Sequence, residues 1–212
     1  MLLERQWADA WHRLGLADSD TWRDRLLASY AEPARHYHTL QHLAECLALC
    51  DEFAHLAERP GEVAIALWFH DAVYQPPAKD NEARSAAWAG AALGEAGAAR
   101  AVIDRVQALV MATARHDAPG EIDAALVIDI DLAILGANPH RFAQYEAQIR
   151  AEYGAVPPHL FQDKRRAVLA HFLARPALYT TPALRTRFEY QARKNLQGAL
   201  GASLVTDANK LR

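Results

Sequence analysis

The fold is decided by one stretch of the chain, Ile65-Ala66-Leu67-Trp68-Phe69-His70-Asp71. An apolar run ends in a histidine that is followed at once by an aspartate. The run predicts a buried helix, and its last turn then delivers an imidazole and a carboxylate to one point. These two groups suit zinc, iron, manganese or nickel, depending on the remaining ligands. We therefore expect the rest of the chain to be organised around this segment.

Further candidate ligands lie far from this stretch in the sequence. His38 and His42 are four residues apart, so one helix face can carry both. A packing role for His42 remains open, because a regular apolar helix follows it. Asp129 and Asp131 interrupt an apolar run and would be costly to bury without partners. One of them can bind a metal while the other orients a ligand histidine; a capping or ion-pair role is the alternative.

The amino-acid composition indicates a folded protein that binds neither nucleic acid nor a membrane. The chain has 212 residues, of which 51% are hydrophobic and 23% charged, so a folded core is expected. The formal net charge of −3 gives nucleic-acid binding no support. No apolar run is long enough to span a bilayer, and we expect a cytoplasmic protein that binds no membrane. The two cysteines, Cys46 and Cys50, are spaced as buried thiols on one helix face rather than as a disulfide framework, and a pair of metal ligands is the alternative.

Apolar residues recur at helical spacing along most of the chain. Leu3, Trp7, Trp11 and Leu14, for example, form one stripe. No strand hairpin or β-α-β alternation is visible, and we predict one all-α domain of roughly ten helices over residues 1–212. The metal-site core is expected at about 35–136, with C-terminal helices packed on it at 138–200. Expected helices include 2–14, 98–115, 122–135 and 182–200.

Prolines and polar residues mark where these helices begin and end. The segment Tyr74-Gln75-Pro76-Pro77 cannot continue a helix, so a loop begins immediately after His70-Asp71. Loops beside ligands often form the mouth of a substrate site. Asp80-Asn81-Glu82 then starts an alanine-rich helix, and Asn138-Pro139 is expected to cap a later one.

Several of these motifs together resemble a bacterial branch of predicted phosphohydrolases in the HD-domain superfamily, whose members depend on a metal. The resemblance covers nearly the whole chain, and the combination of motifs is more specific than any one of them. The matching segments are residues 35–47, Trp68 to Tyr74, Asp80-Asn81-Glu82 with Ser85-Ala86, Asp129-Ile130-Asp131-Leu132 with Ile134-Leu135-Gly136, and Phe188-Glu189 with Ala192-Arg193 and Asn195-Leu196.

The resemblance implies a set of metal ligands. They are His42, His70, Asp71 and Asp131, with Asp129 as the fallback for the last position. Two imidazoles and two carboxylates leave positions open for water and a phosphate oxygen. The set does not fix the divalent metal, which can be Mn, Zn, Fe, Ni or Mg.

The same resemblance suggests catalytic and substrate-binding residues. Asp71 is the candidate base, and His116 is either a phosphate-binding cation or a general acid; a histidine placed favourably at a helix C-terminus is the alternative. Substrate binding falls to His38, Arg35 and Glu82. Arg35 can instead lie simply at the surface, and Glu82 can belong to a helix cap.

The implied activity is hydrolysis of a small phosphorylated metabolite or nucleotide by a metal-activated water. Ala72-Val73-Tyr74 follows His70-Asp71 without an acidic pair, which departs from HD enzymes that degrade guanosine polyphosphates. Two other functions remain open. One is a metal-holding nucleotide-binding or regulatory protein without turnover. The other is an HD-type di-iron oxygenase, for which His38, Glu82 and His116 are the candidate additional ligands.

Overall fold

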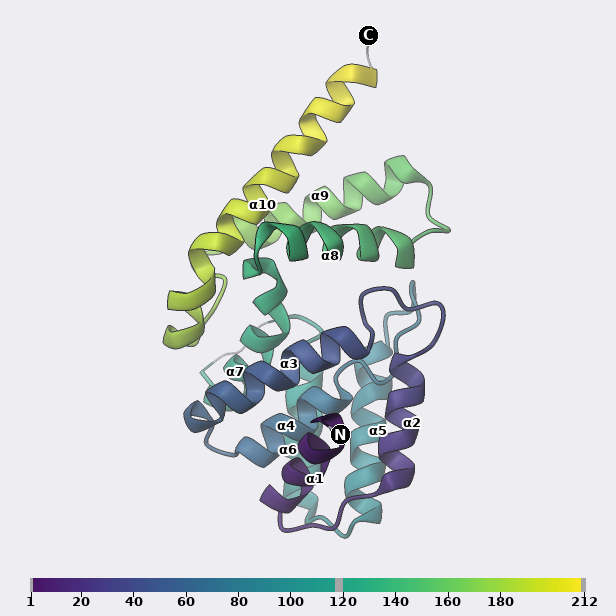
Figure 1. Cartoon of the computed structure of the whole chain (residues 1–212), viewed down its shortest axis with the longest axis vertical. Helices are drawn as coiled ribbons and strands as arrows, with labels where there is room; N and C mark the ends of the chain where they lie inside the picture. The colour runs from purple at the N-terminus through teal and green to yellow at the C-terminus, as the bar shows by residue number, and fades with distance from the viewer. Residues whose placement is uncertain (1, 117–119, 211–212) are drawn as a thin grey trace. The chain divides into compact units, whose positions relative to one another are not determined.

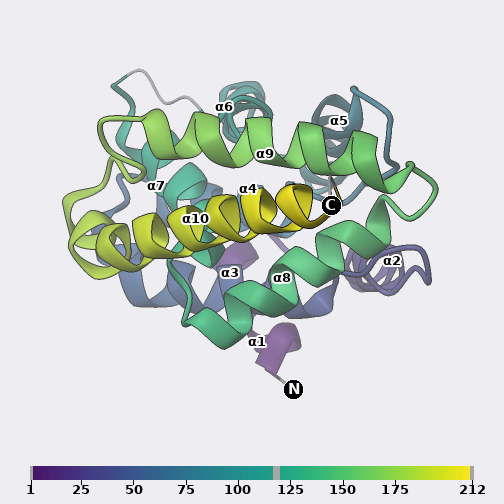
Figure 2. The ribbon, with the colours of Figure 1, turned by 90° about the horizontal axis from the view of Figure 1, so that it is seen from above.

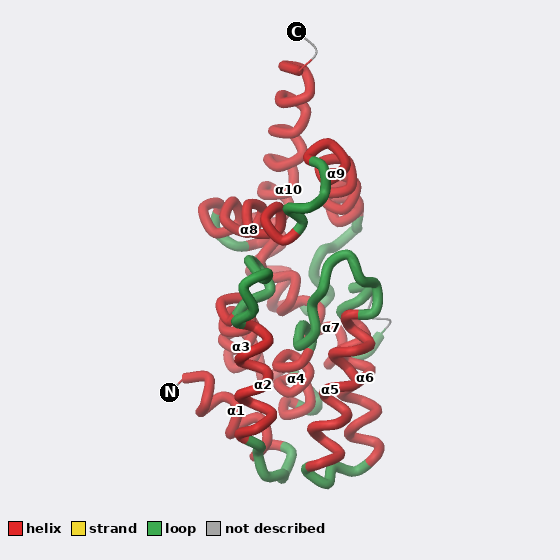
Figure 3. The backbone as a smooth tube through the Cα atoms, turned by 90° about the vertical axis from the view of Figure 1, so that its right-hand side faces the viewer, coloured by secondary structure: helices red, strands yellow, loops and turns green. Residues whose placement is uncertain are grey.

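The structure, a computed structural model, describes residues 2–116 and 120–210, with the backbone alone for 202–210. Within these ranges it is built of α-helices and two short 3₁₀-helices and contains no strand (Figure 1, Figure 3). The predicted all-α class is confirmed. The elements are α1 (Leu2–Arg13), α2 (Asp20–Tyr30), α3 (Leu40–Phe53), η1 (Ala54–Leu56), α4 (Pro60–Phe69), α5 (Asn81–Glu95), α6 (Arg100–Ala112), α7 (Ile122–Asp131), η2 (Leu132–Gly136), α8 (Pro139–Glu152), α9 (Pro158–Ala174) and α10 (Pro182–Lys210).

The chain divides into two compact units, Met1–Asp131 and Leu132–Arg212. The first unit contains α1 to α7, and the second contains η2 and α8 to α10. The assignment of residues 1–212 to a single domain stays a prediction. In the described part of the chain, every helix is too short or too polar to cross a membrane.

The centre of the first unit is α4, the helix that the apolar run predicts. It packs against α1, α3, α5, α6 and α7 (Figure 1). Every residue from Gly61 to Phe69 is buried, and Trp68 and Phe69 are fully so. Trp68 packs edge-on against Trp7, whose ring centroid lies 5.1 Å away. Burying one large apolar side chain stabilises the fold by about 1.5–3 kcal/mol, and α4 buries several of them. This helix therefore forms the core against which the other helices of the unit pack.

Side-chain caps set where α2 and α3 begin. The Ser19 hydroxyl accepts the N–H of Trp22, and the Thr39 hydroxyl accepts the N–H of Gln41. From Thr39 onward, α3 buries one face, which carries His42, Leu43, Cys46, Leu47 and Cys50. Both thiols are buried and form no disulfide, as their spacing predicts.

Three predicted features of helix ends are wrong in detail. The central helix ends at Phe69, and His70 and Asp71 lie in the turn that follows. There His70 Nδ1 donates to the Leu67 carbonyl and the Ala72 N–H donates to the Phe69 carbonyl, so the last carbonyls are satisfied by a tighter turn.

The other two differences concern longer helices. The expected helix 122–135 divides at Asp131, after which the chain continues as the 3₁₀-helix η2. Helix ends often tighten in this way. The final helix continues past residue 200 to Lys210, because the residues after Gly201 include no proline and are compatible with a helix.

The second unit is held together around α10. Helices α8 and α9 flank it (Figure 2), and η2 packs against α8 and α10. The Tyr179 hydroxyl donates to the Leu132 carbonyl, and the Asn195 amide donates to the Leu135 and Ala137 carbonyls. The Asn138 side chain accepts the N–H of Arg141, which confirms the predicted cap of α8.

Candidate metal centre

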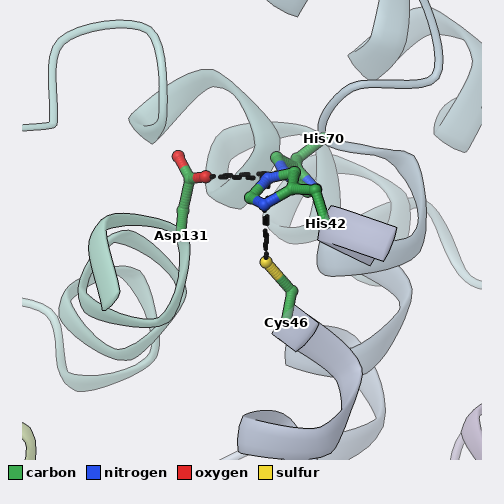
Figure 4. A group of neighbouring side chains, drawn as sticks. All are labelled: His42, Cys46, His70 and Asp131. Carbon is green, nitrogen blue, oxygen red and sulfur yellow. Dashed lines mark hydrogen bonds and ion pairs between the residues drawn. The ribbon is translucent and has the colours of Figure 1, made fainter. Parts of the chain in front are cut away.

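Four side chains from three segments of the first unit converge on one point. His42 comes from α3, His70 and Asp71 from the turn after α4, and Asp131 is the last residue of α7. His42, His70 and Asp131 point toward one another in Figure 4, where Cys46 lies one helical turn beyond His42. The structure therefore brings together the four residues that the sequence resemblance implies as ligands.

The separations within this cluster fit a bound ion. The His42 and His70 Nε2 atoms are 3.0 Å apart, and Asp71 Oδ2 lies 3.0 and 3.5 Å from the His70 and His42 Nε2 atoms. Asp131 Oδ1 lies 3.2 and 3.6 Å from the same two nitrogens. Ligands at about 2.1 Å from an ion are about 3.0 Å apart at right angles and about 3.4 Å apart at tetrahedral angles. The cluster could therefore hold a divalent metal ion.

Burial gives the cluster a closed side and an open side. The His42 and His70 side chains are 2% and 1% exposed, whereas those of Asp71 and Asp131 are 15% and 16% exposed. The exposed area of the cluster thus lies on its carboxylates.

The His70 ring is oriented by the backbone of its own helix. Its Nδ1–H donates to the Leu67 carbonyl over 2.7 Å, which places the lone pair on Nε2, facing the cluster. A second ring nitrogen bonded to a carbonyl is the usual arrangement of a histidine that binds a metal.

Cys46 is a fifth donor near this point, and it is buried, as its spacing from Cys50 predicts. Its sulfur and the ligand atoms of His42, His70 and Asp131 all lie within 4.8 Å of one another. The sulfur is, however, 3.7 and 3.8 Å from the two nitrogens of His42, so it faces the ring and not the Nε2 lone pair. Asp71 Oδ2 is closer to both Nε2 atoms and fits better as the fourth ligand. The spacing of Cys46, four residues after His42, was the available signal.

His116 contacts the outer oxygen of a predicted ligand. It lies in the turn after α6, and its Nε2 is 3.2 Å from Asp131 Oδ2. Asp131 thus presents one oxygen to the buried histidines and the other to His116. The φ of His116 is +49°, which is uncommon for a residue with a side chain and can indicate a functional constraint. Its catalytic role stays a prediction.

Arg35 does not lie at the surface, which was one alternative for it. Its side chain is 2% exposed and donates to the carbonyls of Asp71 and Ala72 at 2.6 and 3.0 Å. It also donates to the His38 carbonyl and to the Glu32 carboxylate. Arg35 therefore holds the backbone beside the cluster, and its contact with a substrate stays a prediction.

The other two predicted substrate residues lie in different settings. His38 is half-buried and its ring stacks on Tyr74, from the loop after Asp71, with the centroids 3.8 Å apart. Glu82 lies in the first turn of α5, and within residues 2–116 and 120–201 it makes no hydrogen bond or ion pair to the cluster. The loop is instead attached to α5 through Asn81 and Ser85, which accept the N–H groups of Gln75 and Val73. The roles of His38 and Glu82 stay predictions.

The charges of the cluster are coupled. Burial alone would raise the pKa of the Asp71 carboxyl, but His70, His38 and His42 outweigh it and hold that pKa well below its usual range. The pKa of Asp131 is lowered in the same way, against burial, by hydrogen bonds to His116, His42 and His70. Burial alone would lower the pKa values of His42 and His70. The carboxylates of Asp71 and Asp131, together with neighbouring thiol and phenol groups, outweigh burial and raise both pKa values in the metal-free protein.

These shifts predict how the metal-free protein responds to pH. The histidine pKa is higher in the folded protein than in the unfolded chain, where it is about 6.5. This difference stabilises the fold at pH values below about 6.5, and the stabilisation is lost as pH rises through the pKa of the folded state. The carboxyl pKa values are lower in the folded protein than in the unfolded chain, where they are about 3.9. This difference stabilises the fold at pH values above about 3.9, and the stabilisation is lost as pH falls through the pKa values of the folded state. In chelator the thermal midpoint should therefore fall on the alkaline side of neutrality. The thermal midpoint of the His70→Ala variant should depend less on pH above neutrality. A wild-type midpoint that does not change with pH above neutrality would contradict the raised histidine pKa.

Comparison with known proteins adds no relative: no family model, no curated protein and no solved structure matches the chain. Function has to be argued from the chemistry of the site.

Proposed function

We propose that the protein is a metal-dependent phosphohydrolase of the HD type, acting on a small phosphorylated metabolite or nucleotide. The observation that supports the proposal is the set of separations of 3.0–3.6 Å among the donor atoms of His42, His70, Asp71 and Asp131. The exposed area of the cluster lies on its two carboxylates, and this is the side from which we expect a water and a phosphate oxygen to reach the ion.

The residues of the cluster have different roles in the proposed reaction. His42, His70, Asp71 and Asp131 would hold the ion, which when bound would lower the pKa of a water and polarise a phosphoryl oxygen. Asp71 stands on the open side and accepts the proton of the attacking water. The phosphorus–oxygen bond to the leaving group breaks as the water oxygen bonds to phosphorus. His116 then supplies a proton to the departing oxygen.

One observation favours a second candidate, a protein that holds a metal without turnover. If the Cys46 side chain rotates toward the ion, then His42, Cys46, His70 and Asp131 form a closed set of four ligands. Structural zinc sites are closed in this way, whereas catalytic sites keep a position open. A cobalt-substituted protein distinguishes the two, because thiolate ligation gives an intense near-ultraviolet charge-transfer band that is absent when Asp71 is the fourth ligand.

The decisive experiment combines metal analysis with a phosphate-release screen. Freshly purified protein should contain a divalent metal and release phosphate from monoesters with at least one of Mn²⁺, Co²⁺, Ni²⁺, Mg²⁺ and Zn²⁺. His70→Ala and Asp71→Ala should each lose the metal and lower the release rate by at least about 100-fold, because a metal supplies several kcal/mol to such reactions. Circular dichroism should remain helical.

A matched control is Asp123→Asn. Asp123 is a buried carboxylate of the same unit that accepts the N–H groups of Glu58 and Arg59 at 2.7 and 3.1 Å. This variant should lose stability but keep both metal and activity. Unchanged metal content in His70→Ala and Asp71→Ala would reject the metal assignment, and metal binding without any phosphate release would reject the phosphohydrolase.

A further inference from the structure

We infer that Tyr30 and Arg35 form a bracket that positions Asp71 in the metal centre. The inference rests on the proposed metal site but concerns two residues that the ligand set does not contain. Both come from the segment that ends α2 and leads to α3, and both reach across to the turn after α4.

The turn that carries His70 and Asp71 has backbone groups that the helix cannot satisfy. Because α4 ends at Phe69, the carbonyls of Trp68, Asp71 and Ala72 lack helical donors, and buried carbonyls need one. The fully buried Tyr30 hydroxyl donates to the Trp68 carbonyl over 3.2 Å. The same oxygen accepts the N–H of Asp71 over 3.3 Å. Tyr30 therefore joins the end of the helix to the peptide of the ligand residue.

Arg35 secures the other side of Asp71. One guanidinium nitrogen donates to the Asp71 carbonyl over 2.6 Å, and the other donates to the Ala72 carbonyl over 3.0 Å. A planar fork suits two consecutive carbonyls, and a lysine ammonium has no equivalent geometry. The guanidinium carbon also lies 5.3 Å from the centre of the Tyr30 ring, so the two parts of the bracket pack on each other.

The bracket thus holds Asp71 at both of its peptide groups. Tyr30 takes the N–H and Arg35 takes the carbonyl, which fixes the backbone torsions from which the carboxylate projects. Asp71 Oδ2 is thereby placed 3.0 Å from His70 Nε2, at the spacing a shared ion requires. Arg35 adds a buried positive charge at the C-terminal end of α4, where the helix dipole favours it. Tyr30 and Arg35 are therefore positioning residues and not ligands.

The test compares two tyrosine variants that lose the same kind of bond. Tyr30→Phe removes the hydroxyl of the bracket. Tyr179→Phe is its control, because Tyr179 is also fully buried and donates to a carbonyl over 3.0 Å, but inside the second unit. Both should lower the thermal midpoint similarly. Tyr30→Phe should raise the Mn²⁺ dissociation constant about 10-fold or more, as loss of groups that support ligands usually does, while Tyr179→Phe leaves it unchanged.

A second pair of variants tests the guanidinium. Arg35→Lys keeps the charge and loses the fork, and Arg105→Lys is its control, because Arg105 makes a two-bond contact with Glu62 elsewhere in the first unit. Free Mn²⁺, followed by electron paramagnetic resonance, gives the dissociation constants. Arg35→Lys should weaken Mn²⁺ binding and Arg105→Lys should not.

The outcomes separate the bracket from the proposed function. Equal Mn²⁺ affinity within both pairs would overturn the bracket and leave the metal centre standing. A wild-type protein that binds no Mn²⁺, Zn²⁺ or Co²⁺ would overturn both. Weaker Mn²⁺ binding in Tyr30→Phe and Arg35→Lys supports the bracket even if the wild-type protein releases no phosphate.

Discussion

Asp131→Asn should weaken metal binding by at least about 100-fold, since even residues that only support ligands cost 10- to 100-fold. The substitution removes the charge of the carboxylate whose Oδ1 lies 3.2 Å from His42 Nε2 and whose Oδ2 lies 3.2 Å from His116 Nε2. An amide also cannot accept a hydrogen bond at both of its atoms. The measurement is metal content after dialysis, together with the Mn²⁺ dissociation constant.

Asp129→Asn is the matched control, two residues earlier in α7. Residues two apart on a helix point about 200° apart, so the two aspartates cannot serve the same ion from a regular helix. Asp129 is 1% exposed, and the variant should keep the metal while its thermal midpoint falls. If Asp129→Asn empties the site and Asp131→Asn leaves it full, the register of the ligand helix is wrong by two residues.

The second large effect is expected at Gly136, where the second unit would be destabilised by about 2–3 kcal/mol or more on substitution by alanine. A Cβ there would lie 2.6 Å from the Phe188 Cβ and 2.7 Å from the Phe188 carbonyl oxygen. The carbonyl belongs to the backbone of α10, so it cannot move aside as a flexible side chain can. Chemical denaturation followed by circular dichroism measures the loss.

Gly198→Ala is the control for this prediction. Gly198 lies in the same helix as Phe188, and a Cβ there meets no heavy atom within 4 Å. Alanine is favoured over glycine within a helix by about 1 kcal/mol, so Gly198→Ala should be neutral or stabilising. A Gly136→Ala protein as stable as wild type would show that η2 and α10 are less closely packed than described.

Much of the fold was predictable because the helices are amphipathic or wholly apolar. The run that ends at Phe69 predicts a central buried helix, and α4 is buried from Gly61 onward. The cap at Asn138 and the loop after Asp71 follow from residues with strong local preferences. Helix ends were less predictable. Residues 132–136 form the 3₁₀-helix η2, which packs at Gly136 against Phe188, about fifty residues further along the chain, and local sequence pattern does not contain such a contact.

The candidate site was predictable to the extent that its residues are of an unusual kind. Histidines and aspartates within apolar segments are informative, and His42, His70, Asp71 and Asp131 do converge. The groups that support them are not visible in this way. Tyr30 resembles an ordinary core aromatic residue, and Arg35 resembles an ordinary surface cation. Their contacts go to backbone carbonyls 36 to 38 residues away, and any residue type offers a carbonyl.

The uneven exposure of the four donor groups also determines how an ion would enter and leave. The imidazoles lie at the inner end of the site, and the carboxylates lie at its mouth. An ion that enters from this side would meet Asp71 and Asp131 while it is still partly hydrated, and would exchange its last waters for nitrogen afterwards. A chelator would compete for the two carboxylate positions before it reaches the two Nε2 atoms.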